Sequence, residues 1–242
     1  MWKSSNYEVI GRYHLKHGLP CQDKTLRLDH DGVSIIALAD GAGSAKDSEA
    51  GAKAAVESAA HFVGRNFDAL VNTADGSDVK LQIYETVISK LQEVSQFMEC
   101  QITDLASTLL LAAVKDDAFL IVHIGDGVIG YLENSELKVA SSPQNGEFAN
   151  ETVFMTSVGA QQMINITKGK IGQIEGFVLM SDGTASSFYN HKRGQLAAPL
   201  KSIFKKNSLL SNVDATHWLK GIFDEFIVTR TTDDCSIAVM SR

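Results

Sequence analysis

The apolar positions of the chain form short runs, and one of these runs, Val33–Ala39, ends directly in Asp40-Gly41. Its seven mostly apolar residues are typical of a strand that is buried on both faces. The Ala-rich stretch that begins at Asp47 has the periodicity of a helix rather than that of a returning strand. The pattern therefore predicts that Asp40 lies at the rim of a sheet, where the adjacent glycine lets a ligand approach the backbone.

The rest of the pattern predicts many short strands and four helices. Strands are expected at 7–14, 24–29, 33–39, 107–114, 118–124, 128–132, 137–140, 176–180 and 235–240, with weaker candidates at 151–156 and 164–168. Helices are expected at 47–66, 79–98, 195–204 and 215–226. The short connections between 107 and 140 favour an antiparallel meander. Because strands and helices do not alternate regularly, the sequence predicts mainly antiparallel sheets with helices packed outside them.

Composition narrows the class of protein. No linker-like stretch divides the 242 residues, so we expect one domain, 1–242. The net charge of -7 argues against a nucleic-acid partner, which favours a basic protein face. Cys21, Cys100 and Cys235 are widely spaced and odd in number, which indicates reduced thiols. The chain shows neither a signal-peptide pattern nor an apolar run long enough for a membrane span, so we expect a cytoplasmic protein without a membrane partner.

Acidic residues follow or precede several of the apolar runs. Three runs end in Asp-Gly, at Asp40, Asp126 and Asp182, and further acidic positions adjoin predicted strands at Asp23 and at Asp233-Asp234. For Asp126 a plain hairpin turn is an equally good interpretation, because another apolar run follows at once. Asp40 and Asp182 are followed by small, helix-favouring residues, so a turn between two strands does not account for them.

Such carboxylates, without His or Cys at zinc-site spacing, suit the hard cations Mg²⁺ and Mn²⁺. Two ions that share one carboxylate can bind a phosphate and activate water for attack on it. The alternative is that these acidic loop residues are simply solvated, as most surface carboxylates are. The residues alone leave both interpretations open.

The order of the motifs is more specific than any one of them. The chain contains, in sequence, Gln22-Asp23, Asp40-Gly41, Gly125-Asp126-Gly127, Ser181-Asp182-Gly183 and Asp233-Asp234. This order resembles the PP2C-type metal-dependent protein phosphatases, and in particular their compact bacterial branch. The resemblance implies an α+β fold in which two packed antiparallel β-sheets are flanked by α-helices on both faces. It also implies a phosphoprotein substrate, the target of a Ser/Thr kinase, and hydrolysis of its phosphoserine or phosphothreonine.

The resemblance assigns a role to each acidic motif. It implies metal ligands at Asp23, Asp40, Gly41, Asp126, Asp182 and Asp233, with Asp23 and Asp40 as catalytic residues. Asp40 matches the carboxylate that bridges two tightly bound Mn²⁺ or Mg²⁺ ions, and Asp23 matches the acid that orients the attacking water. Asp126 matches a ligand of a weaker third ion, although Ser186 stands where some members have a further aspartate for that ion.

Other positions depart from the family pattern. Gln22 replaces a glutamate, Ala42 replaces the histidine of many eukaryotic members, and Asp234 stands where an asparagine is usual. Gly18 occupies the place of the arginine that often binds the phosphate. The basic candidates near that place are His14, Lys16 and His17.

These departures keep a second function open. The first hypothesis is a protein serine/threonine phosphatase in which water, activated by two ions, attacks phosphorus without a covalent phosphoenzyme. The rival is a non-catalytic signalling or scaffold module on the same fold, which the missing arginine and Gln22 favour. A further alternative keeps the chemistry but changes the substrate to phosphorylated transcription regulators or small phosphoesters.

Overall fold

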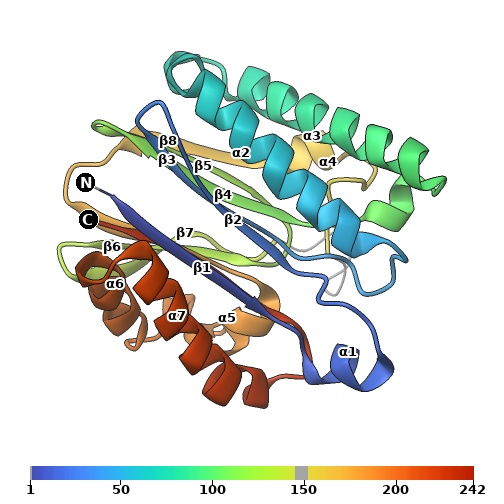
Figure 1. The fold of residues 1–242 in the computed structure, drawn as a ribbon. Helices are drawn as coiled ribbons and strands as arrows, with labels where there is room; N and C mark the ends of the chain where they lie inside the picture. The colour runs from blue at the N-terminus through green and yellow to red at the C-terminus, as the bar shows by residue number, and fades with distance from the viewer. Residues whose placement is uncertain (1, 145–151) are drawn as a thin grey trace.

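The computed structural model describes residues 2–144 and 152–242, which form two five-stranded antiparallel sheets packed face to face (Figure 1). The first sheet consists, in spatial order, of β2 (Lys24–His30), β3 (Val33–Ala39), β4 (Leu109–Lys115), β5 (Ala118–Ile124) and β8 (Asn165–Lys170). The second consists of β1 (Lys3–Val9), β12 (Cys235–Ser241), β9 (Ile174–Met180), β6 (Val128–Glu133) and β7 (Glu136–Ser141). The predicted pair of antiparallel sheets is thus confirmed.

Helices cover the outer faces of both sheets (Figure 1). The long α2 (Ser48–Asn72) and α3 (Gly76–Met98) lie over the first sheet, whereas α5 (Asp182–Phe188), α6 (Leu200–Leu209) and α7 (Asn212–Ile222) lie over the second. The smaller elements are α1 (Arg12–His17), α4 (Ala160–Met163), the hairpin β10 (Tyr189–Asn190) and β11 (Gln195–Leu196), the 3-10 turns Ile102–Leu105 and Val228–Arg230, and the π-helical turn Phe223–Ile227. The predicted α+β class, with helices on both faces, is therefore confirmed.

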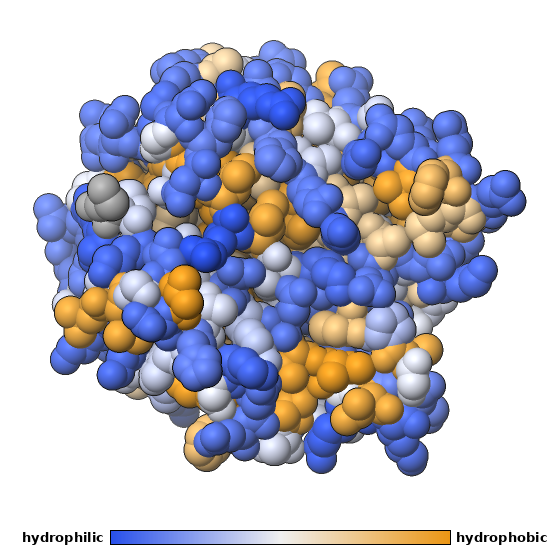
Figure 2. All heavy atoms as spheres, in the orientation of Figure 1, coloured by the Kyte–Doolittle hydropathy of each residue, from blue (hydrophilic) through white to orange (hydrophobic). Residues whose placement is uncertain are grey.

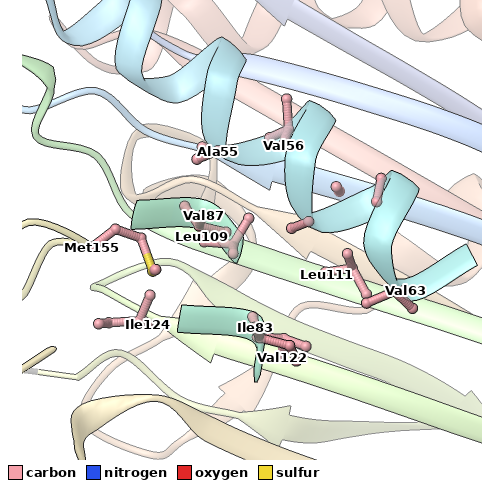
Figure 3. Close-up of a cluster of buried hydrophobic side chains, with 14 of the residues drawn as sticks. Ala55, Val56, Val63, Ile83, Val87, Leu109, Leu111, Val122, Ile124 and Met155 are labelled. Carbon is pink, nitrogen blue, oxygen red and sulfur yellow. The ribbon is translucent and has the colours of Figure 1, made fainter. Parts of the chain in front are cut away.

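The central strand β3 is buried on both of its faces, as its apolar run predicts. Ile35 and Ala37 pack in the layer beneath α2 and α3, where Leu109 and Leu111 of β4 also lie (Figure 3). Ile36 and Leu38 point the other way, into the layer between the two sheets. Because successive side chains of a strand alternate between faces, one continuous apolar run serves both layers.

The surface is more hydrophilic than these buried layers. Figure 2 shows mostly hydrophilic side chains on one face of the molecule, with apolar groups scattered among them, as in other folded chains. In the part of the chain that the structure describes, no helix combines the length and apolarity that a membrane crossing requires.

Several predicted boundaries are wrong. The first strand ends at Val9 and a helix follows it, so 7–14 is not one strand. The helix expected at 195–204 is β11 followed by α6, because Pro199 fixes a backbone angle suited to a helix start and lacks the N–H that an earlier turn would need. No strand occupies 152–156, and residue 151 of that expected strand lies outside the described residues.

The predicted meander is also wrong, because the chain changes sheets between β5 and β6. β5 pairs with β4 and β8, whereas β6 pairs with β7 and β9 of the other sheet. At the crossing, a Cβ on Gly125 would lie 2.4 Å from the Thr108 side chain, and one on Gly127 would lie 2.7 Å from the Met180 carbonyl. Asp126 between these glycines is therefore part of a crossover, and the hairpin interpretation of it is excluded.

Gly51 provides a test of the close packing beneath α2. A Cβ at Gly51 would lie 2.0 Å from the carbonyl oxygen of Leu105, whereas a Cβ at Gly221 in α7 would meet nothing within 4 Å. We expect Gly51→Ala to lower the free energy of unfolding by about 1–3 kcal/mol through overpacking. Gly221→Ala should raise it by about 0.5–1 kcal/mol, as helix propensity predicts. Urea unfolding measures both changes, and a Gly51→Ala protein as stable as wild type would contradict the packing.

Candidate metal centre

The five carboxylates singled out in the sequence meet at one end of the sandwich. Asp23 and Asp40 share one sheet edge, because Lys24, which opens β2, pairs with Ala39, which closes β3. In the other sheet, Met180 pairs with Ile237 and with Val128, so Asp182, Asp233 and Asp126 adjoin neighbouring strand ends there. Strand pairing therefore gathers the carboxylates within each sheet, and the packing of the two sheets brings together residues that are up to 210 positions apart in the chain.

Asp40 has the most crowded electrostatic environment. Desolvation of its carboxyl raises its pKa well above the usual value. The negative charges of Asp23, Asp182, Asp126 and Asp233 raise the pKa further, in that order of importance. Every other predicted carboxylate thus acts on Asp40, which is the geometry expected of a central, shared ligand.

Asp182 and Asp233 also feel the neighbouring charges, although Asp233 is exposed and solvent screens it more strongly than the others. Burial raises the pKa of Asp182 to about 6, and the charges of Asp233 and Asp126 add to the rise, whereas interactions with Asp40 and with the N–H of Gly183 lower it. The pKa of Asp233 is raised chiefly by desolvation, and the positive charge of a protonated His14 would lower it. Several carboxylates are thus held together with little compensating positive charge from the chain itself.

Asp23 is the most deeply buried member, with 1% of its surface exposed. Neither of its carboxylate oxygens has a hydrogen-bond partner among the described residues. Burial and the charge of Asp234 raise its pKa, while the nearby hydroxyls of Ser236 and Ser181 lower it. Because a buried carboxylate without a partner is costly, these oxygens are suited to a hard cation or its water.

The backbone around Asp40 is fixed by Thr108. The Asp40 N–H donates to Thr108 Oγ1 at 2.8 Å, and the Thr108 N–H donates to the Asp40 carbonyl at 2.9 Å. A Cβ on the next residue, Gly41, would lie 2.9 Å from the Gln22 carbonyl oxygen and 3.0 Å from Ser48, so only glycine fits there. From sequence, Thr108 is a small structural residue at the start of a predicted strand, and nothing in the pattern indicates that it binds the Asp40 backbone.

Asp126 is oriented by a residue that the sequence analysis also missed. Thr152 Oγ1 donates to Asp126 Oδ2 at 2.5 Å. The main chain of Gln144 donates to the Gly125 carbonyl at 2.8 Å and so fixes the crossover next to it. Asp126 contributes to the raised pKa values of Asp40, Asp182 and Asp233, so it faces the cluster.

The cluster is open rather than tight. Among the described residues, no three of the five carboxylates bring one oxygen each within 4.8 Å of one another, whereas Asp47, Cys100 and Asp104 near the start of α2 do bring such atoms together. An open set of carboxylates leaves room for the waters that Mg²⁺ retains when it binds to proteins. The donor chemistry therefore fits Mg²⁺ or Mn²⁺, with water completing the coordination.

The basic candidates of the sequence analysis are separated by the structure. His14 is buried, and its Nδ1 lies 2.9 Å from Asp234 Oδ2. Lys16 and His17 are exposed on α1, and Gly18 ends that helix in the left-handed conformation. The buried His14 thus lies against Asp234, whereas the other two candidates are exposed. Arg12, a further exposed basic residue of α1, donates from Nε to the Thr231 carbonyl at 2.9 Å.

Comparison with known proteins agrees with the fold and the motifs. Residues 10–224 match the family model described as Protein phosphatase 2C. The chain is similar to Serine/threonine-protein phosphatase 3 of Escherichia coli strain K12, with 24% identity over 251 residues that cover 98% of this chain and 97% of the relative.

Solved structures of bacterial phosphatases have a similar fold. A bacterial serine phosphatase has a TM-score of 0.68 at 12% identity, with 100% of this chain and 98% of that chain covered. The catalytic domain of the serine threonine protein phosphatase PstP, in complex with two manganese ions, has a TM-score of 0.65 at 14% identity, with 99% and 97% covered. These likenesses confirm the fold, and the match to the family model over most of the sequence confirms the predicted membership: the chain belongs to the protein phosphatase 2C family.

Proposed function

We propose that this protein hydrolyses phosphoserine and phosphothreonine in proteins with the help of two Mn²⁺ or Mg²⁺ ions. The observation that supports this most directly is the convergence of four carboxylates on Asp40. The name of the Escherichia coli relative indicates serine/threonine specificity, and one structural neighbour is a complex with two manganese ions. The link to a Ser/Thr kinase is part of the proposal, since phosphoserine and phosphothreonine are products of such kinases.

The residues that would hold the ions follow from their positions. Asp40 would bridge them, with Asp182, Asp233 and the Gly41 carbonyl completing the two tight sites and Asp126 at a weaker third. Bound there, the ions would lower the pKa of a coordinated water and neutralise the phosphoryl oxygens.

The chain's own groups position the reactants. The Asp23 carboxylate, which has no donor of its own among the described residues, would accept a hydrogen bond from the attacking water and orient it toward phosphorus. Thr108 holds the Asp40 backbone so that this carboxylate keeps its central place. Ala42 has no proton to give to the leaving alkoxide.

The rival hypothesis of a non-catalytic module is less well supported. A binding module has no need of five mutually repelling carboxylates, because their repulsion costs stability and such strain is retained where function requires it. The Gln22 side chain, which replaces an acid, is buried beside the cluster, and its Oε1 has no partner among the described residues.

Metal dependence is the first prediction of the proposal. Turnover of p-nitrophenyl phosphate and of a phosphothreonine peptide should disappear in EDTA and return with Mn²⁺. Ca²⁺ should restore less activity, because it accepts larger and looser coordination. Full activity in a chelated sample, with residual metal checked by elemental analysis, would contradict the proposal.

A second prediction concerns Asp40. Asp40→Asn should lower turnover at saturating Mn²⁺ by about 100-fold or more, because the ions supply several kcal/mol of transition-state stabilisation. In EDTA the same change should raise the melting temperature, since it removes one of several repelling buried charges.

The matched control for this change is Asp116→Asn. Asp116 lies in the β4–β5 turn with φ 51°, a conformation that Asn tolerates, at the far end of the strands from Asp40. Turnover and melting temperature of the control should stay near those of wild type. If Asp40→Asn behaved like Asp116→Asn, Asp40 would not be the shared ligand.

A third prediction concerns Asp126. If Asp126 is a ligand of a weakly held ion, Asp126→Asn should lower turnover. It should also remove the part of the rate increase that requires a high Mn²⁺ concentration. Thr152→Val, which removes the hydroxyl that orients Asp126, should cause a smaller change of the same kind. Rate curves against Mn²⁺ that coincide for wild type and Asp126→Asn would exclude a ligand role.

A further inference from the structure

A single buried carboxylate joins the two ends of the chain beside the candidate metal centre. Asp234 is 2% exposed, and its Oδ1 accepts a hydrogen bond from the N–H of Gly11 at 2.6 Å. Its Oδ2 accepts a hydrogen bond from the N–H of Gln22 at 2.6 Å. His14 Nδ1 lies 2.9 Å from the same oxygen, a close contact that lacks the angles of a regular hydrogen bond. The two backbone donors are 223 and 212 residues away in the sequence. Figure 1 shows the corresponding arrangement, with α1 beside the loop that precedes β12.

These bonds determine where Asp23 lies. The Ser181 and Ser236 hydroxyls lie near the Asp23 carboxylate but form no hydrogen bond of regular geometry with it, so the course of the backbone largely sets its position. On one side of Asp23, Lys24 pairs with Ala39 in the sheet. On the other side, the N–H of Gln22 is held by Asp234. Removal of the second anchor leaves Asp23 fixed from one side only.

The remaining contacts of the Asp234 backbone lead to two other predicted ligands. Asp233 is its neighbour in the chain, and a Cβ on Gly11 would lie 2.2 Å from the Asp233 carbonyl carbon. A Cβ on Gly183, which follows Asp182, would lie 2.1 Å from the Asp234 carbonyl oxygen. Only glycines allow this approach, so segments bearing three ligands meet at one residue.

We propose that Asp234, in contact with His14, is a positioning residue whose carboxylate holds the Asp23 segment in the arrangement that binds the ions, at the place where the backbones next to Asp182 and Asp233 also meet. This inference rests on the proposed function, because it concerns the geometry of the same centre. Both oxygens of the Asp234 carboxylate accept hydrogen bonds from backbone N–H groups, so Asp234 is not a metal ligand. In this chain its role uses two acceptor oxygens, one for each backbone donor, which the asparagine usual at this position in the family does not offer.

Asp234→Asn is therefore an informative substitution. The side chain keeps its shape, but its NH₂ group must face the N–H of Gly11 or that of Gln22, and either orientation leaves one buried backbone donor without an acceptor. Because this change also removes a negative charge near the centre, weaker Mn²⁺ binding alone does not distinguish positioning from charge.

His14→Leu separates the two effects. It removes the partner of Asp234 and leaves the carboxylate charge in place, so electrostatics alone predicts unchanged or tighter Mn²⁺ binding. Positioning predicts weaker binding instead. Asp224→Asn is the control for loss of a hydrogen-bonded carboxylate elsewhere, since Asp224 accepts bonds from Tyr7 and Lys220 beyond α7.

The experiment measures Mn²⁺ affinity by calorimetry and amide hydrogen exchange at Gly11 and Gln22 in the metal-free full-length protein. We expect Asp234→Asn to weaken Mn²⁺ binding by about 10-fold, because loss of a group that orients metal ligands lowers metal affinity. His14→Leu should weaken Mn²⁺ binding as well, for the same reason. Exchange at Gln22 should accelerate in both variants, and Asp224→Asn should match wild type in affinity and in exchange.

Each contrary result has a distinct meaning. If wild type binds no Mn²⁺, the proposed function fails and this inference with it. If wild type binds Mn²⁺ but His14→Leu binds it equally well or more tightly, the positioning role alone is overturned. A lower melting temperature of Asp234→Asn with unchanged Mn²⁺ affinity would also overturn it, because the residue would then be structural only.

Discussion

The repulsion among five carboxylates at one end of the sandwich is the constraint on which the rest of the structure depends. Left to themselves, these groups would separate or take up protons, as the raised pKa values of Asp23, Asp40 and Asp182 show. The two sheets oppose that tendency, because each carboxylate adjoins a strand whose apolar residues are buried in the core or, in β2, packed against it. The hydrophobic layers thus offset the electrostatic cost of the centre.

The sequence predicts much of this arrangement because the relevant signals are local. A continuous apolar run marks a doubly buried strand such as β3, and an Asp-Gly at its end marks the rim of the sheet. Boundaries at 7–14 and 195–204 were wrong because short helices and hairpins depend on tertiary contacts. The predicted meander was wrong for the same reason. The tight Gly125-Asp126-Gly127 connection has the sequence of a hairpin turn, and only its contacts with Thr108 and Met180 show that it crosses between the sheets.

The parts of the site that sequence could not predict are those made by distant contacts. Thr108 and Thr152 orient the backbone or side chain of other residues, and nothing in their neighbourhood in the chain marks them. Asp234 stands out in the sequence as an acidic residue, but its bonds to Gly11 and Gln22 do not. His14 is a basic candidate from sequence, but it is buried 2.9 Å from Asp234. Ligand residues are easier to predict than the residues that position them, because only the ligands recur in a recognisable order.

The most direct test of the account is a crystal of the protein soaked in Mn²⁺ and measured at the manganese absorption edge. The account predicts two anomalous peaks that share Asp40 as a ligand, one of them also bound by Asp182 and Asp233. Peaks confined to Asp47 and Asp104, or the absence of a peak at Asp40 under saturating Mn²⁺, would contradict it.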